Sequence, residues 1–590
     1  MSAPRFSVVT PVHDPPPDLL EACIDSIMSQ TLRDWEWCVA DDGSLSPAVI
    51  SRLRSLAEDP RVRLLTHERS SGIVAASNSA LSLAKGEWIA LLDHDDCLEP
   101  RALATVAEAI DARPDVDYVY TDEDKLAPDG TRYGELLKPD WSPERLRAQN
   151  YCTHLSVLRR AVVTDVGGFR EGFDGRQDHD LILRVTERAR RVHHVPEILY
   201  HWCATPGSAA GDPAAKPHAQ ALGVRAIGDH LDRVGIDATV QLTENPGNFR
   251  VVRRVEDPPA VSVIIPTAGS SREVWGIDRP LIYRCLDSLC SVTEYPSMEV
   301  VVVLDPKTRG RVVTEIERWR RQDVASRIVV AAGDEFNFSR RINLGVGHAS
   351  GELLVLLNDD VLVEQRDWLE RMVGFTAEPD VGIVGCRLLY GDGTLQHGGI
   401  LCNEQPLHIF HGFAGDDPGP FGLLQIDREV SAVTAACMLT PRRVFDEIGG
   451  LPEHFAVAFN DLEYCLRVRD SGRRIIWTPQ ATLCHFESQS RGRGVSPDEV
   501  DELYRRWGEQ LRHDPYGNPQ FAPYQAEWVP RWRADTSLGV RRRLRTLRNV
   551  VRRSGELTPS VNAARPRPRR PPRRQPGPPR PGLPRRHSRR

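Results

Sequence analysis

The chain lacks the cysteine pattern of a disulfide framework or a zinc cluster. Its twelve cysteines are scattered through 590 residues and form no Cys-x-x-Cys pair, which is typical of buried thiols in a reducing compartment. No uninterrupted apolar run approaches the ~20 residues of a membrane-spanning helix. Residues 1–5 lead into an expected strand without a signal-peptide core. The sequence therefore predicts a soluble, cytoplasmic protein, and its 40% hydrophobic content is enough for substantial cores.

Lysine is absent from the last part of the chain, and acidic side chains are almost absent there. Residues 541–590 hold eighteen arginines and one acid, Glu556. The net charge of −6 therefore combines +17 in this segment with −23 in the rest of the chain. Because the basic charge lies outside the expected folded body, we expect no nucleic-acid binding by that body.

The basic segment divides into two parts. Four apolar residues from Val540 to Val551 fall at i, i+4, i+7 and i+11 among arginines, which predicts a basic amphipathic helix over residues 536–557. Residues 558–590 are rich in proline and arginine and cannot bury a core, so we expect them to be disordered. Residues 537–590 are interpreted either as a peripheral contact with anionic lipid at the inner face of the cell membrane or as a solubilising extension.

One acidic strand end occurs twice in the body. The apolar run of residues 88–92 stops at residues 93–96, Asp-His-Asp-Asp, and the run of residues 353–357 stops at residues 358–360, Asn-Asp-Asp. A buried strand that ends at carboxylates delivers oxygen ligands to the edge of an open α/β sheet where ligands bind. Mg²⁺ and Mn²⁺ prefer such ligands. The recurrence, more than either motif alone, predicts two metal-assisted sites.

Further landmarks recur in the same order in the two halves. The pairs are Pro11 and Pro266, offset by 255 residues; Asp95 and Asp360, by 265; Asp178 and Asp461, by 283; and His201 and His485, by 284. The offset changes slowly and never reverses, as insertions in loops would produce. The pattern indicates duplication of one domain of about 230–280 residues.

Each half alternates strand and helix patterns, which predicts right-handed crossovers and a mainly parallel α/β sheet. We expect a first domain over residues 1–235 and a second domain over residues 259–535. Residues 236–258 are expected to link them, with a short strand at residues 238–240 and turn residues at 245–247.

An acid and a histidine recur late in each half. Asp178 and Asp461 begin helical patterns, where an acid is either a cap favoured by the helix dipole or a general base facing the metal site. His201 and His485 follow these acids by 23 and 24 residues. Metal or diphosphate binding and a structural role are both open for the two histidines.

Longer motifs also occur at matching positions. They are SVVTPVHD, VADDGS, GEWIALLDHDD and GRQDHDLILRV in the first half, and SVIIPT, GELLVLLNDD, AFNDLEYCLRV and CHFESQSRG in the second. On these motifs, over about residues 6–202 and 261–494, both halves resemble family 2 glycosyltransferases of the GT-A fold. The wording is similar to that of bacterial enzymes that build rhamnose-rich and O-antigen-type polysaccharides. The resemblance implies two tandem, Rossmann-like GT-A domains, nucleotide-sugar donors and, usually, inversion at the anomeric carbon.

The resemblance also implies roles for individual residues. Asp178 and Asp461 would be the catalytic bases that take the proton of the acceptor hydroxyl. The implied donor-binding residues are Asp42, Asn78, Asp93, Asp95, Asp305, Asn343, Asn358 and Asp360. The implied ligands of Mn²⁺ or Mg²⁺ are Asp95, His201, Asp360 and His485. The metal would stabilise the departing nucleoside diphosphate, so that no protein acid is required.

Acceptor contacts are the least determined part of the site. Trp141 either stacks on a sugar face or packs in a core or interface, and Asp122 either lines the acceptor channel or lies in a solvated loop.

The leading interpretation is a bifunctional glycosyltransferase that extends a cell-surface polysaccharide or a lipid-linked glycan. The second half departs from the motif, because Asn358 replaces an acid and LDPKT replaces ADDGS. One active domain plus a non-catalytic carbohydrate-binding or scaffold domain is therefore the alternative. A nucleotidyltransferase is a third class, but it needs a glycine-rich basic loop that residues 13–17 do not provide.

Overall fold

The structure is a computed structural model, and it describes residues 3–203, 217–308, 310–319, 325–332, 336–486 and 495–534. The helix expected over residues 536–557 and the disordered segment expected over residues 558–590 lie outside these ranges. Within them, no helix combines the length and the apolar character that a bilayer crossing requires.

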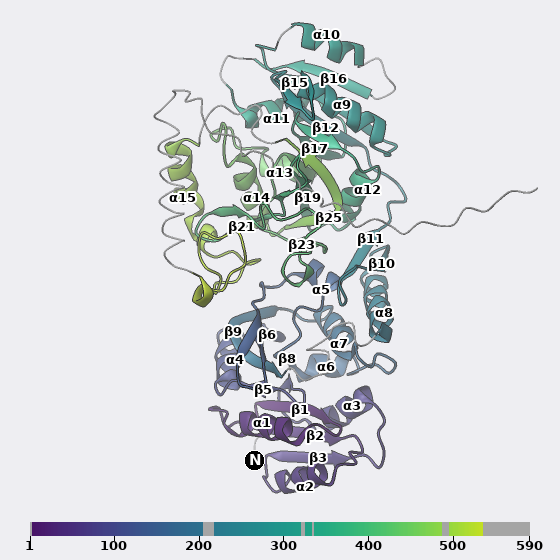
Figure 1. Ribbon diagram of the computed structural model, residues 1–590, viewed down its shortest axis with the longest axis vertical. Helices are drawn as coiled ribbons and strands as arrows, with labels where there is room; N and C mark the ends of the chain where they lie inside the picture. The colour runs from purple at the N-terminus through teal and green to yellow at the C-terminus, as the bar shows by residue number, and fades with distance from the viewer. Residues whose placement is uncertain are drawn as a thin grey trace, which may run out of the picture.

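A nine-stranded sheet forms the core of the first half, at the bottom of Figure 1. Its order is β3-β2-β1-β4-β8-β6-β9-β5, and β7 pairs with β6. The strands are β1 (Phe6–Val12), β2 (Trp35–Asp41), β3 (Val62–Thr66), β4 (Trp88–Leu91), β5 (Cys97–Leu98), β6 (Tyr118–Leu126), β7 (Arg132–Leu136), β8 (Ser156–Arg159) and β9 (Val192–Cys203). The helices are α1 (Pro17–Met28), α2 (Pro47–Leu56), α3 (Ile73–Leu83), α4 (Ala102–Asp111), α5 (Pro143–Ala148), α6 (Arg160–Asp165) and α7 (Gln177–Thr186).

A ten-stranded sheet forms the core of the second half, in the order β16-β15-β12-β17-β24-β19-β25-β18. Its path strands are β12 (Val261–Thr267), β15 (Met298–Leu304), β16 (Ala325–Val330), β17 (Leu353–Leu357), β18 (Val361–Val363), β19 (Val381–Leu389), β24 (Cys437–Pro441) and β25 (Arg474–His485). Smaller strands are β13 (Ser271–Val274), β14 (Ile277–Pro280), β20 (Leu395–His397), β21 (Ile400–Cys402), β22 (Pro406–His408) and β23 (Arg428–Glu429). The helices are α9 (Leu281–Val292), α10 (Gly310–Trp319), α11 (Phe338–Gly347), α12 (Trp368–Val373), α13 (Arg442–Ile448), α14 (Asn460–Asp470) and α15 (Pro497–Arg512).

The two sheets follow the same path, strand for strand. In each, the first strand pairs in parallel with its neighbours on both sides, β1 with β2 and β4, and β12 with β15 and β17. The strands after the acidic motif bring in antiparallel pairs, β4 with β8 and β17 with β24. The prediction of two α/β domains with mainly parallel sheets is confirmed.

The Gly-Glu pair that precedes each acidic strand has a packing reason. A Cβ on Gly86 would lie 2.7 Å from the backbone nitrogen of Ser7, and one on Gly351 would lie 2.6 Å from that of Ser262. Each glycine N–H instead donates to the serine hydroxyl, at 2.8 and 2.7 Å. Only glycine permits this close approach of backbones. The contact fixes where the acidic strand begins relative to the first strand of each sheet.

The segment expected to link the domains holds more structure than the one short strand predicted for it. After α8 (Pro217–Val234), strands β10 (Ala238–Leu242) and β11 (Phe249–Arg253) form an antiparallel hairpin. Phe249 and Val251 are buried in a hydrophobic cluster of the first half. The expected strand at residues 238–240 lies within β10, whereas the sequence reading missed β11.

Charged side chains are buried where the two halves meet, near α5 and β11 in Figure 1. The cluster consists of Glu144, Arg147, Arg253, Glu378, Glu429 and Arg474. Arg253 lies 2.7 Å from Glu144 and 2.6 Å from Glu378. Three acids and three bases balance one another, which is what permits their burial.

Asp427 lies beside this charge cluster and titrates unusually. Its carboxylate accepts a hydrogen bond from Thr478 Oγ1 at 2.6 Å and another from Gln480 Nε2. Burial and the neighbouring charge of Glu144 raise the pKa of Asp427 from 3.8 to about 7. Because the folded chain keeps this proton to a higher pH than the unfolded chain, this group makes folding less favourable as pH rises through that interval.

We predict that Asp427→Asn removes this pH dependence, because the amide stays neutral. The variant should gain stability relative to the wild type between about pH 5 and about pH 8, by up to about 4 kcal/mol. Urea unfolding of both chains at a series of pH values measures the difference. If the free energies of unfolding of the two chains change in parallel with pH, Asp427 does not cause this pH dependence.

Candidate functional site

The acidic strand end of the first half lies at the centre of the sheet. Strand β4 runs beside β1, and the chain then turns through residues 93–96 into β5. The ligand atoms of Asp93, Asp96 and His154 all lie within 4.8 Å of one another. The His154 ring stacks on Tyr200, with ring centroids 4.5 Å apart. Two carboxylates and an imidazole in this arrangement form a set suited to a divalent cation.

Asp93 and Asp96 of this strand end lie in different surroundings. Burial raises the pKa of Asp93, and the charges of Asp95 and Asp178 add to the rise while His154 opposes it. Burial also raises the pKa of Asp96 well above its usual value, and its oxygens accept from Tyr200 Oη at 2.6 Å and the Cys203 nitrogen at 2.7 Å. Asp96 is thus held by the fold, whereas Asp93 lies among acids whose charge a cation would relieve.

His201 lies away from this group, contrary to its predicted place in the metal shell. Its Nδ1 is 2.6 Å from Asp124 Oδ1, and its Nε2 is 3.2 Å from Glu99 Oε1. Both ring nitrogens therefore face carboxylates, one on β6 and one just after β5. The structure assigns His201 a place in this side-chain network and puts His154 beside the acidic strand end.

The second half brings its predicted residues together more directly. His485 Nε2 lies 3.1 Å from Asp360 Oδ1 and 3.4 Å from Asn358 Nδ2. Burial and the charge of Asp360 raise the pKa of Asp359 to about 7, and Thr267 Oγ1 donates to Asp359 at 2.5 Å. Asn358, Asp360 and His485 form one group in the second half.

Sheet register explains why the two sites use different histidines. Trp88 and Leu353 occupy matching positions, and they pair with Arg159 and Pro441. Five residues earlier on each chain stand His154 and Ala436. The second half thus has no counterpart of His154.

The second histidine of the pattern is also displaced by its neighbours. Cys97 pairs with His201, and Val361 pairs with His485, so Glu99 corresponds to Val363. Without a carboxylate at that position, His485 turns to Asp360 instead.

The two predicted bases stand at the start of matching helices, α7 and α14. Asp178 Oδ2 accepts from Asn150 Nδ2 at 2.9 Å, and Asp461 Oδ2 accepts from the Ala435 nitrogen at 3.1 Å. The charge of Asp178 contributes to the raised pKa of Asp93, so the two carboxylates lie close enough to interact. Their geometry is compatible with a base opposite a metal site, and their catalytic role stays a prediction.

The two predicted asparagines hold matching turns. Both amide groups pair with backbone: Asn78 donates to the Phe169 carbonyl at 2.8 Å and accepts from its nitrogen at 3.0 Å. Asn343 makes the same two bonds to Leu451, each at 2.9 Å. These contacts fix the double-glycine turn that precedes each base, and a direct donor contact stays a prediction.

The two predicted donor-binding acids at the ends of β2 and β15 have different partners. Asp42 accepts from the nitrogens of Ser71 and Gly72 at 2.8 and 3.0 Å and lies 2.7 Å from His67 Nδ1. Asp305 accepts from the Lys307 nitrogen at 2.8 Å and is paired with Arg341. Asp42 thus organises the loop that begins α3. Contact of either acid with a nucleotide stays a prediction.

Asp122 and Trp141, the two predicted acceptor contacts, lie at buried or interdomain positions. Asp122 is fully buried, and its carboxylate accepts from the Lys138 nitrogen at 2.8 Å and from Asn518 Nδ2 at 2.9 Å. An acceptor cannot reach it, so its assignment to an acceptor channel is wrong. Trp141 is half-buried against a core cluster and lines a junction cavity with Arg147 and Arg474, which places it at the interface.

Two protein-family models match the chain. "Glycosyl transferase family 2" matches residues 7–166, and "Glycosyltransferase like family 2" matches residues 258–509. The chain belongs to family 2 of the glycosyltransferases. The predicted tandem arrangement of two GT-A domains and the assignment as a glycosyltransferase are confirmed by these matches.

Curated relatives extend over both family 2 domains. An uncharacterized protein of Sinorhizobium fredii is 41% identical over 91% of this chain and 60% of its own length. The O-antigen biosynthesis protein RfbC of Myxococcus xanthus is 38% identical over 88% of this chain and 40% of its own length. The chain therefore spans less than two thirds of either relative.

A solved structure is also similar. The mannosyltransferase PcManGT from Pyrobaculum calidifontis, in complex with GDP-Man and Mn²⁺, is 21% identical with a TM-score of 0.31. The match covers 45% of this chain and 67% of that one.

Comparison of the halves could not have found His154. The repeat selects residues that both halves share, and the second half has Ala436 at this position. His154 ends the segment Asn-Tyr-Cys-Thr-His, which lies far in sequence from Asp93 and Asp96. Only the pairing of β4 with β8 brings it there.

Proposed function

We propose that the chain is a bifunctional glycosyltransferase that transfers sugars from nucleotide-sugar donors to a growing polysaccharide or lipid-linked glycan. The observation that carries the proposal is that each family 2 domain sets an acidic strand end at the centre of its sheet. A second carboxylate, Asp178 or Asp461, stands at the start of a matching helix. The similarity to an O-antigen biosynthesis protein supports a polysaccharide product.

Mn²⁺ or Mg²⁺ fits the residues present. In the first domain Asp93 and His154 would hold it, with Asp95 in the same turn. In the second domain Asp360 and His485 would hold it. A bound divalent cation stabilises the negative charge of a departing diphosphate.

The chain's own carboxylates would perform the proton chemistry. Asp178 Oδ1 or Oδ2 accepts the proton of the attacking acceptor hydroxyl, while Asn150 holds the carboxylate in place. Attack from the face opposite the departing diphosphate gives inversion at the anomeric carbon. Asp461 performs the same step in the second domain.

One active domain plus a non-catalytic carbohydrate-binding or scaffold domain is the alternative. Asn358 favours it, because the amide removes one negative charge from the second strand end.

Thermal unfolding of the full chain with a panel of UDP, dTDP and GDP sugars, each with and without Mn²⁺, tests the proposal. A donor that binds the folded state raises the unfolding midpoint through mass action, and the rise should require Mn²⁺. The lack of any donor-dependent shift across the panel would contradict a nucleotide-sugar enzyme.

Attachment of residues 537–590 to anionic membranes is proposed on their charge alone. Each basic residue near an anionic surface contributes about 1 kcal/mol. Co-sedimentation with anionic liposomes should therefore require these residues, and binding that survives their deletion would contradict the proposal.

A further inference from the structure

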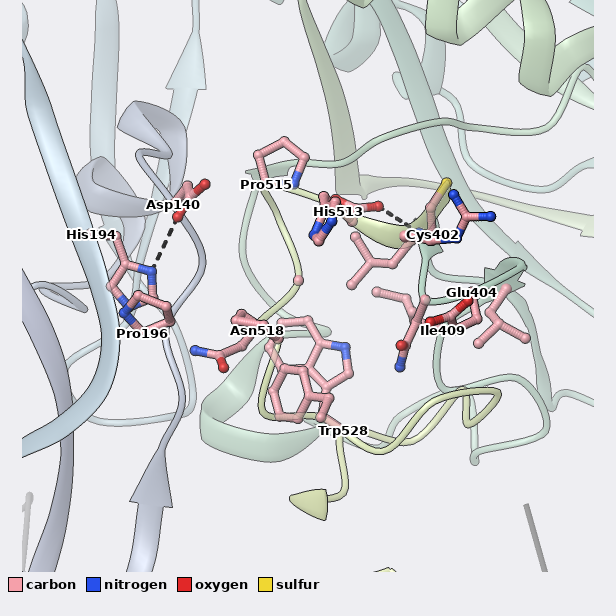
Figure 2. A pocket seen from close by; sticks show the side chains of 18 of the residues that line it. Asp140, His194, Pro196, Cys402, Glu404, Ile409, His513, Pro515, Asn518 and Trp528 are labelled. Carbon is pink, nitrogen blue, oxygen red and sulfur yellow. Dashed lines mark hydrogen bonds and ion pairs between the residues drawn. The ribbon is translucent and has the colours of Figure 1, made fainter. Parts of the chain in front are cut away.

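A segment of the second domain crosses onto the first. We define residues 513–534, which follow α15, as the C-terminal arm. Asn518 of this arm is 6% exposed, and its amide nitrogen donates to Asp122 Oδ2 at 2.9 Å and to the Lys138 carbonyl at 2.8 Å. Figure 2 shows Asn518 reaching from the arm toward the strand that carries His194 and Pro196. The arm is therefore bonded into the interior of the first domain.

The residue that Asn518 contacts, Lys138, is itself completely buried. Its ammonium group donates to Glu123 Oε2 at 2.9 Å, to the Cys152 carbonyl at 3.1 Å and to the His154 carbonyl at 2.5 Å. These three partners use all three N–H donors of a lysine. A buried lysine is tolerated only with such partners, so its position is strictly defined.

Glu123 holds the same loop from its other side. Its Oε2 accepts from Thr153 Oγ1 at 3.0 Å and from the His154 nitrogen at 3.2 Å. The Lys138–Glu123 pair therefore bonds both the nitrogen and the carbonyl of His154. Its imidazole is left to stack on Tyr200 and to face Asp93 and Asp96.

The peptide of Lys138 is fixed on both sides in turn. Its nitrogen donates to Asp122 Oδ1 at 2.8 Å, and its carbonyl accepts from Asn518. Asp122 also lies 2.9 Å from His194 Nε2. Removing the Asn518 amide leaves a buried carbonyl and a buried carboxylate oxygen each short of a donor, which disturbs the backbone that places Lys138.

We infer that the second domain positions the metal-binding histidine of the first. Asn518 acts through Lys138 and Glu123 on His154, so the first site is complete only when the arm is docked. The inference rests on the proposed function, since it concerns the same cation site. The inference concerns the first site, because the second domain has Ala436 where the first has His154.

The test uses Mn²⁺ alone as the probe, with the full chain in an Asp360→Asn background so that the first site dominates the titration. Free Mn²⁺ is measured by electron paramagnetic resonance. Asn518→Ala should weaken Mn²⁺ binding about 10- to 100-fold, the effect of removing a group that orients a metal ligand. Asn403→Ala is the matched control, because Asn403 lies in the second domain and its Nδ2 bonds the Ala522 carbonyl of the same arm at 2.7 Å.

A double-mutant cycle separates positioning from general loosening. His154→Ala should weaken binding at least as much as Asn518→Ala, and the double variant should be no weaker than His154→Ala alone. Asn518→Ser, which keeps a shorter polar side chain, repeats the comparison if Asn518→Ala unfolds. Additive losses, or binding unchanged by either Asn518 variant, would overturn the inference alone. No Mn²⁺ binding by the Asp360→Asn chain would overturn the metal assignment as well.

Discussion

Asp178→Asn lowers transfer by the first domain about 100- to 10,000-fold, the usual contribution of a positioned general base. The amide cannot take the proton of the acceptor hydroxyl, but it is the same size as the carboxylate. Its oxygen can still accept the hydrogen bond from Asn150, 2.9 Å away in the wild type. Donor-dependent thermal stabilisation should therefore persist while the initial rate at saturating donor falls.

Asp165→Asn is the matched control for this variant. Asp165 ends α6 and is exposed to solvent, so the same chemical change there should leave the rate within about twofold, as expected of surface substitutions. A loss of less than tenfold in Asp178→Asn, with the rate measured from the first domain, would assign the base to another residue.

Glu144→Gln destabilises the junction of the two domains by about 3–5 kcal/mol, because it leaves an uncompensated positive charge in a buried cluster. Burial acts to raise the pKa of Glu144, but Arg253 and Arg147 outweigh it and hold the pKa below its usual value. The Glu144 side chain is 1% exposed, so water cannot solvate the arginines that lose their partner. Urea unfolding, with limited proteolysis near β11 as a second readout, measures the effect.

Glu87→Gln is the control for the charge change. Glu87 pairs with Arg159 but is 60% exposed, and surface pairs of this kind contribute about 0–1 kcal/mol. Equal stability losses in the two variants would show that the cluster at the junction has no special weight.

The fold could be predicted from the sequence because local patterns indicate its strands and helices and because these patterns occur in both halves. The alternating strand and helix patterns of each half predicted the α/β sheets, and the apolar runs before Asp93 and Asn358 predicted buried strands. Such signals depend only on residues close in sequence. The hairpin strand β11 was missed although Phe249, Val251 and Arg253 are buried in alternation along it.

The acidic strand ends, the late acids and the two late histidines were selected because they recur in both halves, and their catalytic and metal-binding roles stay predictions. The roles of His154 and His201 could not be separated from sequence, since the difference arises from contacts of His201 with Glu99 and Asp124 that only the fold creates. The buried charge cluster was likewise invisible, because its members lie far apart in the chain.

Linkage analysis of products tests most directly whether the chain has two active sites. The wild type, Asp178→Asn and Asp461→Asn are incubated with the donors identified by thermal unfolding and a glycan acceptor, and the linkages formed are resolved. Two active sites predict that each variant loses a different linkage or a different step of chain extension. If Asp461→Asn makes the wild-type product at the wild-type rate, the second domain is not catalytic, and the account of two transfer sites is contradicted.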